Sequence, residues 1–377
     1  MVTPGLHPPE RDVVVIGGGP AGLAAAIAAA AKGLSVTLAD AANPPIDKAC
    51  GEGLMPDSLE ALSKLGVIPP FSVGAAFRGI RFLGEGGTVQ AAFPTGPAIG
   101  IRRVVLHGLL AERAAALGVD LRWGTSVHGL SAEGVVQFAD NEQVRARYII
   151  GADGQNSLVR RWAGLTAERH HTRRFGFRRH YRMEPWSDYM EIYWGPKFQV
   201  YTTPVGVDEV CVAVMSRDSA LRLDTALSHF PKLASRLQHV PVSSADRGSV
   251  ITSRGFQRIH TTNVALVGDA SGSADAITGD GLCLSFQQAV LLSDALISGN
   301  LAGYQRRHRQ IALRPTVMGA LMLSHAPFPK LQRRFLQALS SRPELFAHML
   351  AMHVGASSPL KFLTRAILPL GWRMLKV

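Results

Sequence analysis

A glycine-rich turn near the start of the chain limits what this sequence can fold into more than any other feature. The turn spans residues 17–22, follows the apolar run Val13–Ile16 and precedes the Ala-rich segment Leu23–Lys32, which stops at Gly33. This order predicts a strand, a tight turn and a helix whose free N–H groups and positive end face a phosphate. We therefore predict a dinucleotide site at Gly17, Gly19, Pro20, Ala21 and Gly22.

The segment after this helix extends the pattern to a βαβ unit. A second apolar run, Ser35–Ala39, ends at Asp40. We expect the Asp40 carboxylate to accept hydrogen bonds from the ribose hydroxyls of the adenosine. The alternative is a glycine-rich loop in an unrelated α/β protein, and the turn by itself does not separate FAD from NAD.

A second glycine-rich region, far along the chain, separates the two cofactors. The apolar run Val264–Val267 opens into Gly268-Asp269, and residues 275–281 precede a helical pattern over Leu282–Ile297. Here the sequence resembles the superfamily of FAD-dependent monooxygenases and geranylgeranyl-reductase-like flavoproteins, which share the aromatic-hydroxylase fold. The resemblance implies FAD, with Asp269 at the ribityl chain and a helix N-terminus that stabilises the reduced flavin. The residues implied at this end of the cofactor are Gly268, Asp269, Gly279, Asp280, Gly281 and Leu282, and Ala276 stands where the family often has proline.

Three shorter segments fit the same resemblance. Gly151–Gly154 matches the family's Asp-Gly motif, which is associated with NAD(P)H use. Arg103–Leu106 matches the family's Arg-x-x-Leu element. Lys48–Pro56 matches the Cys-Gly loop of the geranylgeranyl-reductase-like branch. The further cofactor residues, to which we add Val127, are Lys48, Cys50, Gly51, Arg103 or its neighbour Arg102, Asp153 and Gly154. Each segment has an alternative interpretation. The Asp-Gly motif could be a turn into a helix capped by Asn156 or Ser157, and Arg103 could be a surface arginine. Cys50 could be a small packing residue rather than a catalytic thiol.

The order of the elements predicts the architecture. We expect an α/β fold with an FAD-binding Rossmann-like domain of the glutathione-reductase type, an inserted antiparallel β-sheet substrate domain and C-terminal helices. The FAD domain would be discontinuous, over 1–75, 98–168 and 250–300, with the substrate domain over 76–97 and 169–249. Residues 301–377 would form helices broken at prolines, namely Pro315, Pro327, Pro329, Pro343, Pro359 and Pro369.

Positive charge is concentrated in two places. The net charge is +12, and residues 300–377 hold twelve Lys/Arg residues but one acid, Glu344. Basic and bulky apolar residues alternate over 328–376, which predicts either helices lying on an anionic membrane or a helical cap packed on the substrate domain. A second basic segment, Arg169–Arg182, holds six arginines. Without a nucleic-acid-binding motif, it indicates a solvated strand pair or a docking site for an NADPH phosphate.

The remaining composition narrows the compartment and excludes common metal sites. The N-terminus lacks an apolar signal segment, and no run of about 18 apolar residues predicts a spanning helix, so we expect a cytoplasmic protein, at most peripheral to a membrane. The cysteines Cys50, Cys211 and Cys283 form neither a disulfide framework nor a zinc pattern. The adjacent His170 and His171 are a weak metal signal, and we expect no metal.

The sequence constrains the reaction less than it constrains the cofactor. One hypothesis is an NAD(P)H- and O2-using monooxygenase of an aromatic, phenolic or lipid-like secondary metabolite. The alternative is a flavin reductase or dehydrogenase of a carbon–carbon double bond; the least favoured is a non-catalytic FAD-binding protein. The reductase branch has a Tyr-x-Trp-x-Phe-Pro strand, of which only Tyr201 and Pro204 are kept, and this favours the monooxygenase. The catalytic candidates are Cys50, Tyr201 and His180, with Tyr181 and Tyr193 in the same presumed sheet.

Overall fold

The glycine-rich turn lies between a buried strand and a helix, as predicted. The computed structural model describes residues 9–376, without the side chains of 169–171 and 375–376. Strand β1 (Glu10–Ile16) leads through the turn into helix α1 (Pro20–Ala30) and strand β2 (Val36–Asp40). The side chains of Val13–Val15 are completely buried, which is usual for a parallel strand covered on both faces.

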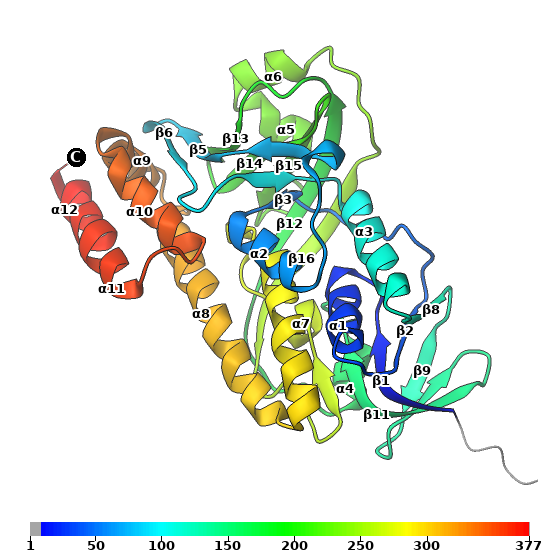
Figure 1. Ribbon diagram of the computed structural model, residues 1–377. Coiled ribbons are helices and arrows are strands. Elements are labelled where there is room, and N and C mark those ends of the chain that lie inside the picture. The colour runs from blue at the N-terminus through cyan, green and yellow to red at the C-terminus, as the bar shows by residue number, and fades with distance from the viewer. Residues whose placement is uncertain (1–8, 377) are drawn as a thin grey trace, which may run out of the picture.

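The first sheet collects strands from distant parts of the chain. Its seven strands follow the order β8-β2-β1-β11-β10-β9, and β17 joins β11. The strands not yet bounded are β8 (Asp120–Trp123), β9 (Val127–Leu130), β10 (Val135–Phe138), β11 (Gln143–Gly151) and β17 (Val264–Leu266). Helices α3 (Arg103–Ala116) and α7 (Gly281–Ser298) pack against α1 beside this sheet (Figure 1).

The second sheet is the inserted one. Its seven strands follow the order β16-β12-β15-β14-β13-β5-β6, and every neighbouring pair is antiparallel except β13 with β5. The strands are β5 (Gly79–Gly84), β6 (Gly87–Ala92), β12 (Glu168–Arg182), β13 (Tyr189–Gly195), β14 (Phe198–Gly206), β15 (Glu209–Ser216) and β16 (Arg247–Phe256). A small third sheet has the order β3-β7-β4, with bounds Gly53–Leu54, Ala98–Gly100 and Ala75–Phe77. The predicted fold class is confirmed.

The C-terminal segment is helical, but two predicted breaks are wrong: Pro369 lies within an uninterrupted helical stretch over 359–376, and Pro315 lies within a long helix. Pro329, Pro343 and Pro359 begin helices, where their missing N–H groups cost nothing. Pro315 instead lies inside the long helix α8 and is buried there, so packing of α8 outweighs the lost hydrogen bond. The C-terminal helices are α8 (Leu301–His325), α9 (Pro329–Ser341), α10 (Pro343–His353), α11 (Pro359–Phe362), a π-helical turn η4 (Leu363–Ile367) and α12 (Leu368–Lys376).

Shorter helices lie in the connections between strands. The α-helices are α2 (Pro56–Lys64), α4 (Leu158–Trp162), α5 (Leu223–Ser228) and α6 (Pro231–Leu237). The 3-10 turns are η1 (Phe71–Val73), η2 (Gly268–Ser271) and η3 (Ala276–Thr278). Two of these turns, η2 and η3, follow β17 and lead to the start of α7, so they bring the second glycine-rich region to the edge of the first sheet.

The inner faces of the C-terminal helices cover the second sheet. Phe335 and Leu336 of α9 are buried with Phe346 of α10, in one apolar cluster with Phe82 of β5. The rings of Phe82 and Phe346 lie 4.5 Å apart between centroids. Figure 1 shows these helices, in orange to red, beside β5 and β6. The helical cap expected from the sequence therefore exists on this inner face.

Helix α7 is a core helix. Among the described residues it is the one helix long and apolar enough to cross a membrane, and 56% of it is buried within the protein. It packs against α1, α2 and α8, so its apolar residues are explained by the core.

A buried histidine in α8 should make stability depend on pH. His325 stacks on Phe335 at 3.8 Å between ring centroids, and burial lowers its pKa from 6.5 to about 4. The unfolded chain then binds this proton more readily, so the free energy of unfolding should fall from pH 6.5 toward pH 4, by up to about 1.4 kcal/mol per pH unit. His325→Leu should remove this part of the slope in urea unfolding curves, whereas His239→Leu, at an exposed site, should leave it. An unchanged slope in His325→Leu would contradict the assignment.

Candidate active site

Three strand ends meet at one edge of the first sheet. In the parallel register, Ile16 of β1 pairs with Gly151 of β11, and Gly151 pairs with Leu266 of β17. The turns that follow these strands, beginning at Gly17, Gly151 and Gly268, therefore open on the same side. They border a cavity of 610 Å³. Ligands of open α/β sheets bind at such carboxyl ends.

Most of the predicted cofactor residues border this cavity. They come from turns and loops before and after the inserted sheet, so the fold gathers segments that are distant in the sequence. These residues are Gly17, Gly19, Pro20, Ala21, Asp40, Lys48, Cys50, Gly51, Arg103, Val127, Asp153, Gly154, Gly268, Asp269, Gly279, Gly281 and Leu282. Their individual contacts with FAD stay predictions.

Three predicted residues are placed differently. A Cβ at Gly22 would lie 1.8 Å from the carbonyl oxygen of Gly17, so Gly22 serves packing behind the turn. Arg102 bonds Glu209, with 2.7 Å between Nη1 and Oε1, and does not border the cavity, whereas Arg103 does. Asp280 is buried and 3.8 Å from His353, and burial raises the pKa of its carboxyl. Neither Arg102 nor Asp280 borders the cavity, and their contacts with FAD stay predictions.

The cavity has the shape and polarity that FAD needs. A Cβ at Gly19, Gly51, Gly154, Gly279 or Gly281 would meet no atom within 4 Å, so the backbone lies open to a ligand there. Helices α1 and α7 both begin at this wall, and neither carries an acid in its first turn. Their N-termini therefore offer positive potential for a pyrophosphate and for a reduced flavin. Arg103 and Asp153 each keep a buried polar atom, Nε and Oδ1, without a partner among the described residues.

Polar side chains organise the cofactor wall. Asp40 accepts the N–H groups of Gly18 and Ala42 at 2.6 and 2.7 Å and so holds the first turn. Lys48 and Asp269 form an ion pair with 3.0 Å between Nζ and Oδ2. This pair ties the Cys-Gly loop to the turn after β17, where the ribityl chain is expected.

The Asp-Gly motif is also a helix cap. Asp153 accepts the N–H groups of Leu158 and Val159 at 2.6 and 3.1 Å, and Ser157 accepts that of Arg160. The capping alternative at Ser157 is therefore present, and Asp153 borders the cavity as well.

Glu52 is a site residue that the sequence analysis missed. It has a φ of +59° and is buried; its Oε1 accepts the N–H of Arg103 at 3.0 Å, and its Oε2 lies 2.5 Å from Nε2 of His180. On the other side of the ring, Nδ1 of His180 is 2.7 Å from Ser244 Oγ and 2.9 Å from Arg178 Nη1. The signal available in the sequence was an acid inside a Cys-Gly-Glu-Gly run. His180 does not border the cavity, so it positions the loop through Glu52 rather than reaching a substrate.

Glu52, His180 and Cys211 together resemble a metal site in spacing but not in charge. One ligand atom from each lies within 4.8 Å of the others. Arg178 contacts His180, and Nε of Arg102 is 4.0 Å from Oε2 of Glu52. Two guanidinium groups oppose a cation here, and burial raises the pKa of the Cys211 thiol, which keeps it protonated. The cluster is better explained as a buried hydrogen-bond network.

The tyrosine candidates are also engaged elsewhere. The Tyr201 hydroxyl donates to the carbonyl of Ile277 at 3.3 Å, and that of Tyr193 donates to Glu191 at 2.7 Å. Tyr181 is 3.3 Å from Arg179. None of the three borders the cavity, whereas Cys50 does, and the catalytic roles of Tyr201 and Cys50 stay predictions.

The arginine-rich strand is only in part a solvated face. Arg174 and Arg178 of β12 are buried and pair with Asp275 and Asp47 at 2.9 and 2.6 Å. Arg179 binds two carboxylates, Asp224 and Asp246, at 2.7 Å each. These pairs correct the expectation of a solvated strand or a phosphate site for Arg174, Arg178 and Arg179, whereas Arg173 and Arg182 are exposed, as expected for a solvated strand. His170 and His171 lie outside the described side chains.

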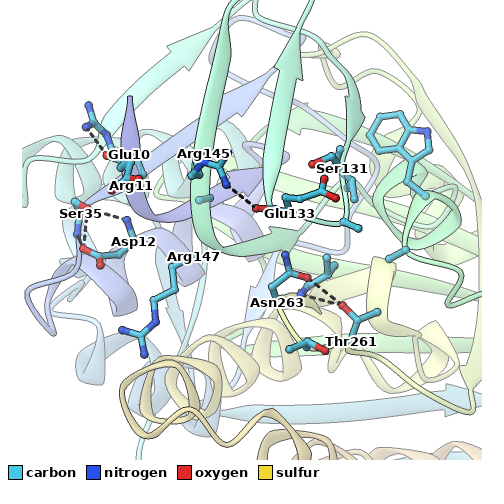
Figure 2. Close-up of a pocket in the computed structure, with 17 residues that line it drawn as sticks. Glu10, Arg11, Asp12, Ser35, Ser131, Glu133, Arg145, Arg147, Thr261 and Asn263 are labelled. Atoms are coloured by element: carbon cyan, nitrogen blue, oxygen red, sulfur yellow. Dashed lines mark hydrogen bonds between the residues drawn. The ribbon is translucent and has the colours of Figure 1, made fainter. Parts of the chain in front are cut away.

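A second cavity lies at the opposite end of the first sheet. Figure 2 shows its polar wall, with Glu10, Arg11 and Asp12 at the start of β1 and Ser35 before β2. Asp12 accepts hydrogen bonds from the backbone and hydroxyl of Ser35, which lower the pKa of its carboxyl. Because these are the amino ends of the strands, this cavity is separate from the cofactor turns, and none of the predicted site residues borders it.

Comparison with known families decides the cofactor. Residues 10–220 match the model described as "FAD binding domain". The chain belongs to this family. It is an FAD-dependent oxidoreductase, as the two glycine-rich turns predicted.

The similar curated proteins include reductases and a monooxygenase. The menaquinone reductase of Mycobacterium tuberculosis is 30% identical over 326 residues, 78% of each chain. The digeranylgeranylglycerophospholipid reductase of Methanosarcina acetivorans is 28% identical over 78% of this chain and 74% of its own. The rifampicin monooxygenase of Streptomyces venezuelae is 34% identical, over 41% of this chain and 34% of its own.

Solved structures support the fold. A flavoprotein/dehydrogenase from Cytophaga hutchinsonii superposes with a TM-score of 0.81 over 97% of this chain and 99% of its own, at 17% identity. PqsL of Pseudomonas aeruginosa, in complex with 2-aminobenzoylacetate, gives a TM-score of 0.75 over 86% of this chain and 98% of its own, at 21% identity.

Substitution of two glycines in the first turn should affect different properties, FAD affinity for Gly19 and stability for Gly22. Gly19→Ala places a methyl group in open cavity space, so the apoprotein should keep its thermal midpoint while FAD affinity falls about tenfold or more. Gly22→Ala drives a methyl group into the Gly17 carbonyl and should cost about 1–3 kcal/mol of stability. Calorimetry of the apoproteins and fluorescence titration with FAD separate the two effects. Equal loss of stability in both variants would contradict these roles.

Asp269 should contribute directly to FAD retention. A charge-assisted hydrogen bond is worth about 1.5–3 kcal/mol, so Asp269→Ala should weaken FAD binding by about ten- to a hundredfold. Asp294→Ala, near the C-terminal end of α7 and paired with Lys32 outside the cavity, is the control and should keep the flavin. The readout is flavin absorbance after gel filtration; full retention in Asp269→Ala would rule out the ribityl contact.

Proposed function

We propose that this protein is a flavin reductase that adds hydrogen to a carbon–carbon double bond of a hydrophobic, isoprenoid-type substrate, with NAD(P)H as co-substrate. The sequence analysis favoured a monooxygenase and held this reaction as the alternative. The geometry of the cavity and the similar proteins now favour the alternative.

The observation that carries the proposal is the apolar wall that the second sheet presents to the cavity. The residues of this sheet that border the cavity are Met190 of β13, Met215 of β15 and Ile251 of β16. Methionine side chains adapt their shape to a flexible apolar chain. A hydroxylase of a phenol gains from a base that holds the phenolate, yet the tyrosines and His180 of this sheet point elsewhere. Such a wall fits a hydrocarbon better than a phenol.

The relatives with reductase names support the same reaction. The relatives named menaquinone reductase and digeranylgeranylglycerophospholipid reductase align over about three quarters of both chains, so the alignment extends well beyond the 10–220 match. The rifampicin monooxygenase aligns over about a third of its length. An alignment that extends beyond residues 10–220 is a better guide to the substrate class than one limited to a third of the relative.

Each part of the wall has a task in this reaction. FAD, when bound, supplies the hydride chemistry, and the protein binds, orients and excludes water. The N-termini of α1 and α7 stabilise negative charge on the pyrophosphate and the reduced ring. Lys48 and Asp269 hold the cofactor end of the Cys-Gly loop, and Glu52 with His180 holds its other end. Met190, Met215 and Ile251 would hold the apolar substrate in the cavity.

Turnover without oxygen tests the proposal. With NADH or NADPH, under argon, a polyprenyl quinone should gain H2 per reduced double bond, and its presence should speed nicotinamide oxidation. Met215→Lys should raise the substrate KM about tenfold or more, because hydrocarbon binding would remove the introduced charge from water, which costs free energy. The FAD content should be unchanged. Mass spectrometry of the product gives the readout. Turnover only in air, with oxygen from labelled O2 in the product, would establish the monooxygenase instead, and no turnover with either substrate class would favour a non-catalytic protein.

A further inference from the structure

We propose that the outer face of the C-terminal helix, residues 359–376, docks on an anionic lipid bilayer. The helix runs without interruption from α11 through the π-helical turn into α12. This inference rests on the chemistry of the surface and does not depend on which reaction the flavin performs.

The two faces of this helix differ sharply. Phe362, Ala366 and Leu370 repeat every four residues and are buried against the apolar cluster of α9 and α10. The opposite side exposes large apolar side chains: Leu360 (71% exposed), Leu363 (47%), Leu368 (60%) and Trp372 (62%). A row of exposed leucines with a tryptophan is the apolar half of an interfacial helix.

Basic residues lie among these apolar ones. Lys361 and Arg365 are exposed on the same helix. Helix α9, which packs against α12, adds Lys330, Arg333 and Arg334, also exposed. Among the described residues, none of these five forms an ion pair with a carboxylate, and residues 345–376 contain no Asp or Glu. The cations are therefore available to an outside partner.

The charges decide between possible occupants. A second copy of this chain would bring an equally basic face, and the like charges would repel. A bilayer with anionic headgroups supplies opposite charge over a broad, flat area and accepts the apolar side chains just below the headgroups. Tryptophan, with an apolar ring and a polar N–H, is favoured at that depth. Figure 1 shows α11 and α12 at the outer edge of the molecule, beyond α9 and α10.

Vesicle co-sedimentation of the FAD-loaded protein tests the inference. We expect binding to phosphatidylcholine vesicles that contain phosphatidylserine, weak binding to phosphatidylcholine alone, and release by high salt. Lys361→Gln with Arg365→Gln should weaken binding by about thirtyfold, and Leu360→Glu with Leu368→Glu should abolish it. Ile68→Glu with Val207→Glu changes two equally exposed apolar residues elsewhere and should bind like the unchanged protein. Flavin absorbance reports that every variant is folded.

Three results would overturn the proposal. The first is equal binding of neutral and anionic vesicles. The second is unchanged binding of both C-terminal variants. The third is the absence of vesicle binding together with a dimer, seen by light scattering, that Leu360→Glu with Leu368→Glu dissociates; this would assign the face to a second copy. Because no turnover is measured, failure here is distinct from failure of the proposed reaction.

Discussion

The parallel register of β1, β11 and β17 is the constraint on which the rest of this structure depends. It brings the ends of three strands to one edge, although β17 follows β11 only after the whole second sheet has been formed. Each strand ends in a glycine-containing turn, and two of these turns lead to long helices, α1 and α7. Those helices pack against each other, so their N-termini converge. The convergence of two helix dipoles is what makes one cavity suited to both a pyrophosphate and a reduced flavin.

Buried polar contacts then hold the second sheet against this edge. Glu52 reaches His180 on β12, Arg174 on β12 reaches Asp275, and Tyr201 on β14 reaches the backbone of Ile277. Each contact joins a loop at the cavity to a strand of the large sheet. Removing one partner of a buried charged pair costs about 3–5 kcal/mol, so these contacts specify one arrangement of loop and sheet. They also explain why so many titratable residues of the sheet are unavailable for chemistry on a substrate.

The two faces of the C-terminal helices have different roles, one in packing and one at the surface. The inner face closes the apolar side of the large sheet through Phe335 and Phe346, and the outer face keeps leucines and basic side chains in contact with solvent. The sequence analysis treated membrane contact and packing as alternatives for one set of residues. The structure divides that set between two faces of the same helices, because side chains project around a helix axis with a period of about 3.6 residues.

The sequence by itself determined the local elements and the cofactor. The first turn, the Ala-rich helix and the Gly-Asp turn after β17 depend on positive φ values and helix starts that neighbouring residues specify, as at Gly17 and Gly268. Only the tertiary structure decided that Arg103 rather than Arg102 borders the cavity, that Asp280 is buried, and that His180 binds Glu52. Those outcomes depend on partners from distant strands, which no local pattern contains. Pro315 is another position where the local pattern gave the wrong prediction, because the packing of α8 outweighs the tendency of proline to break a helix.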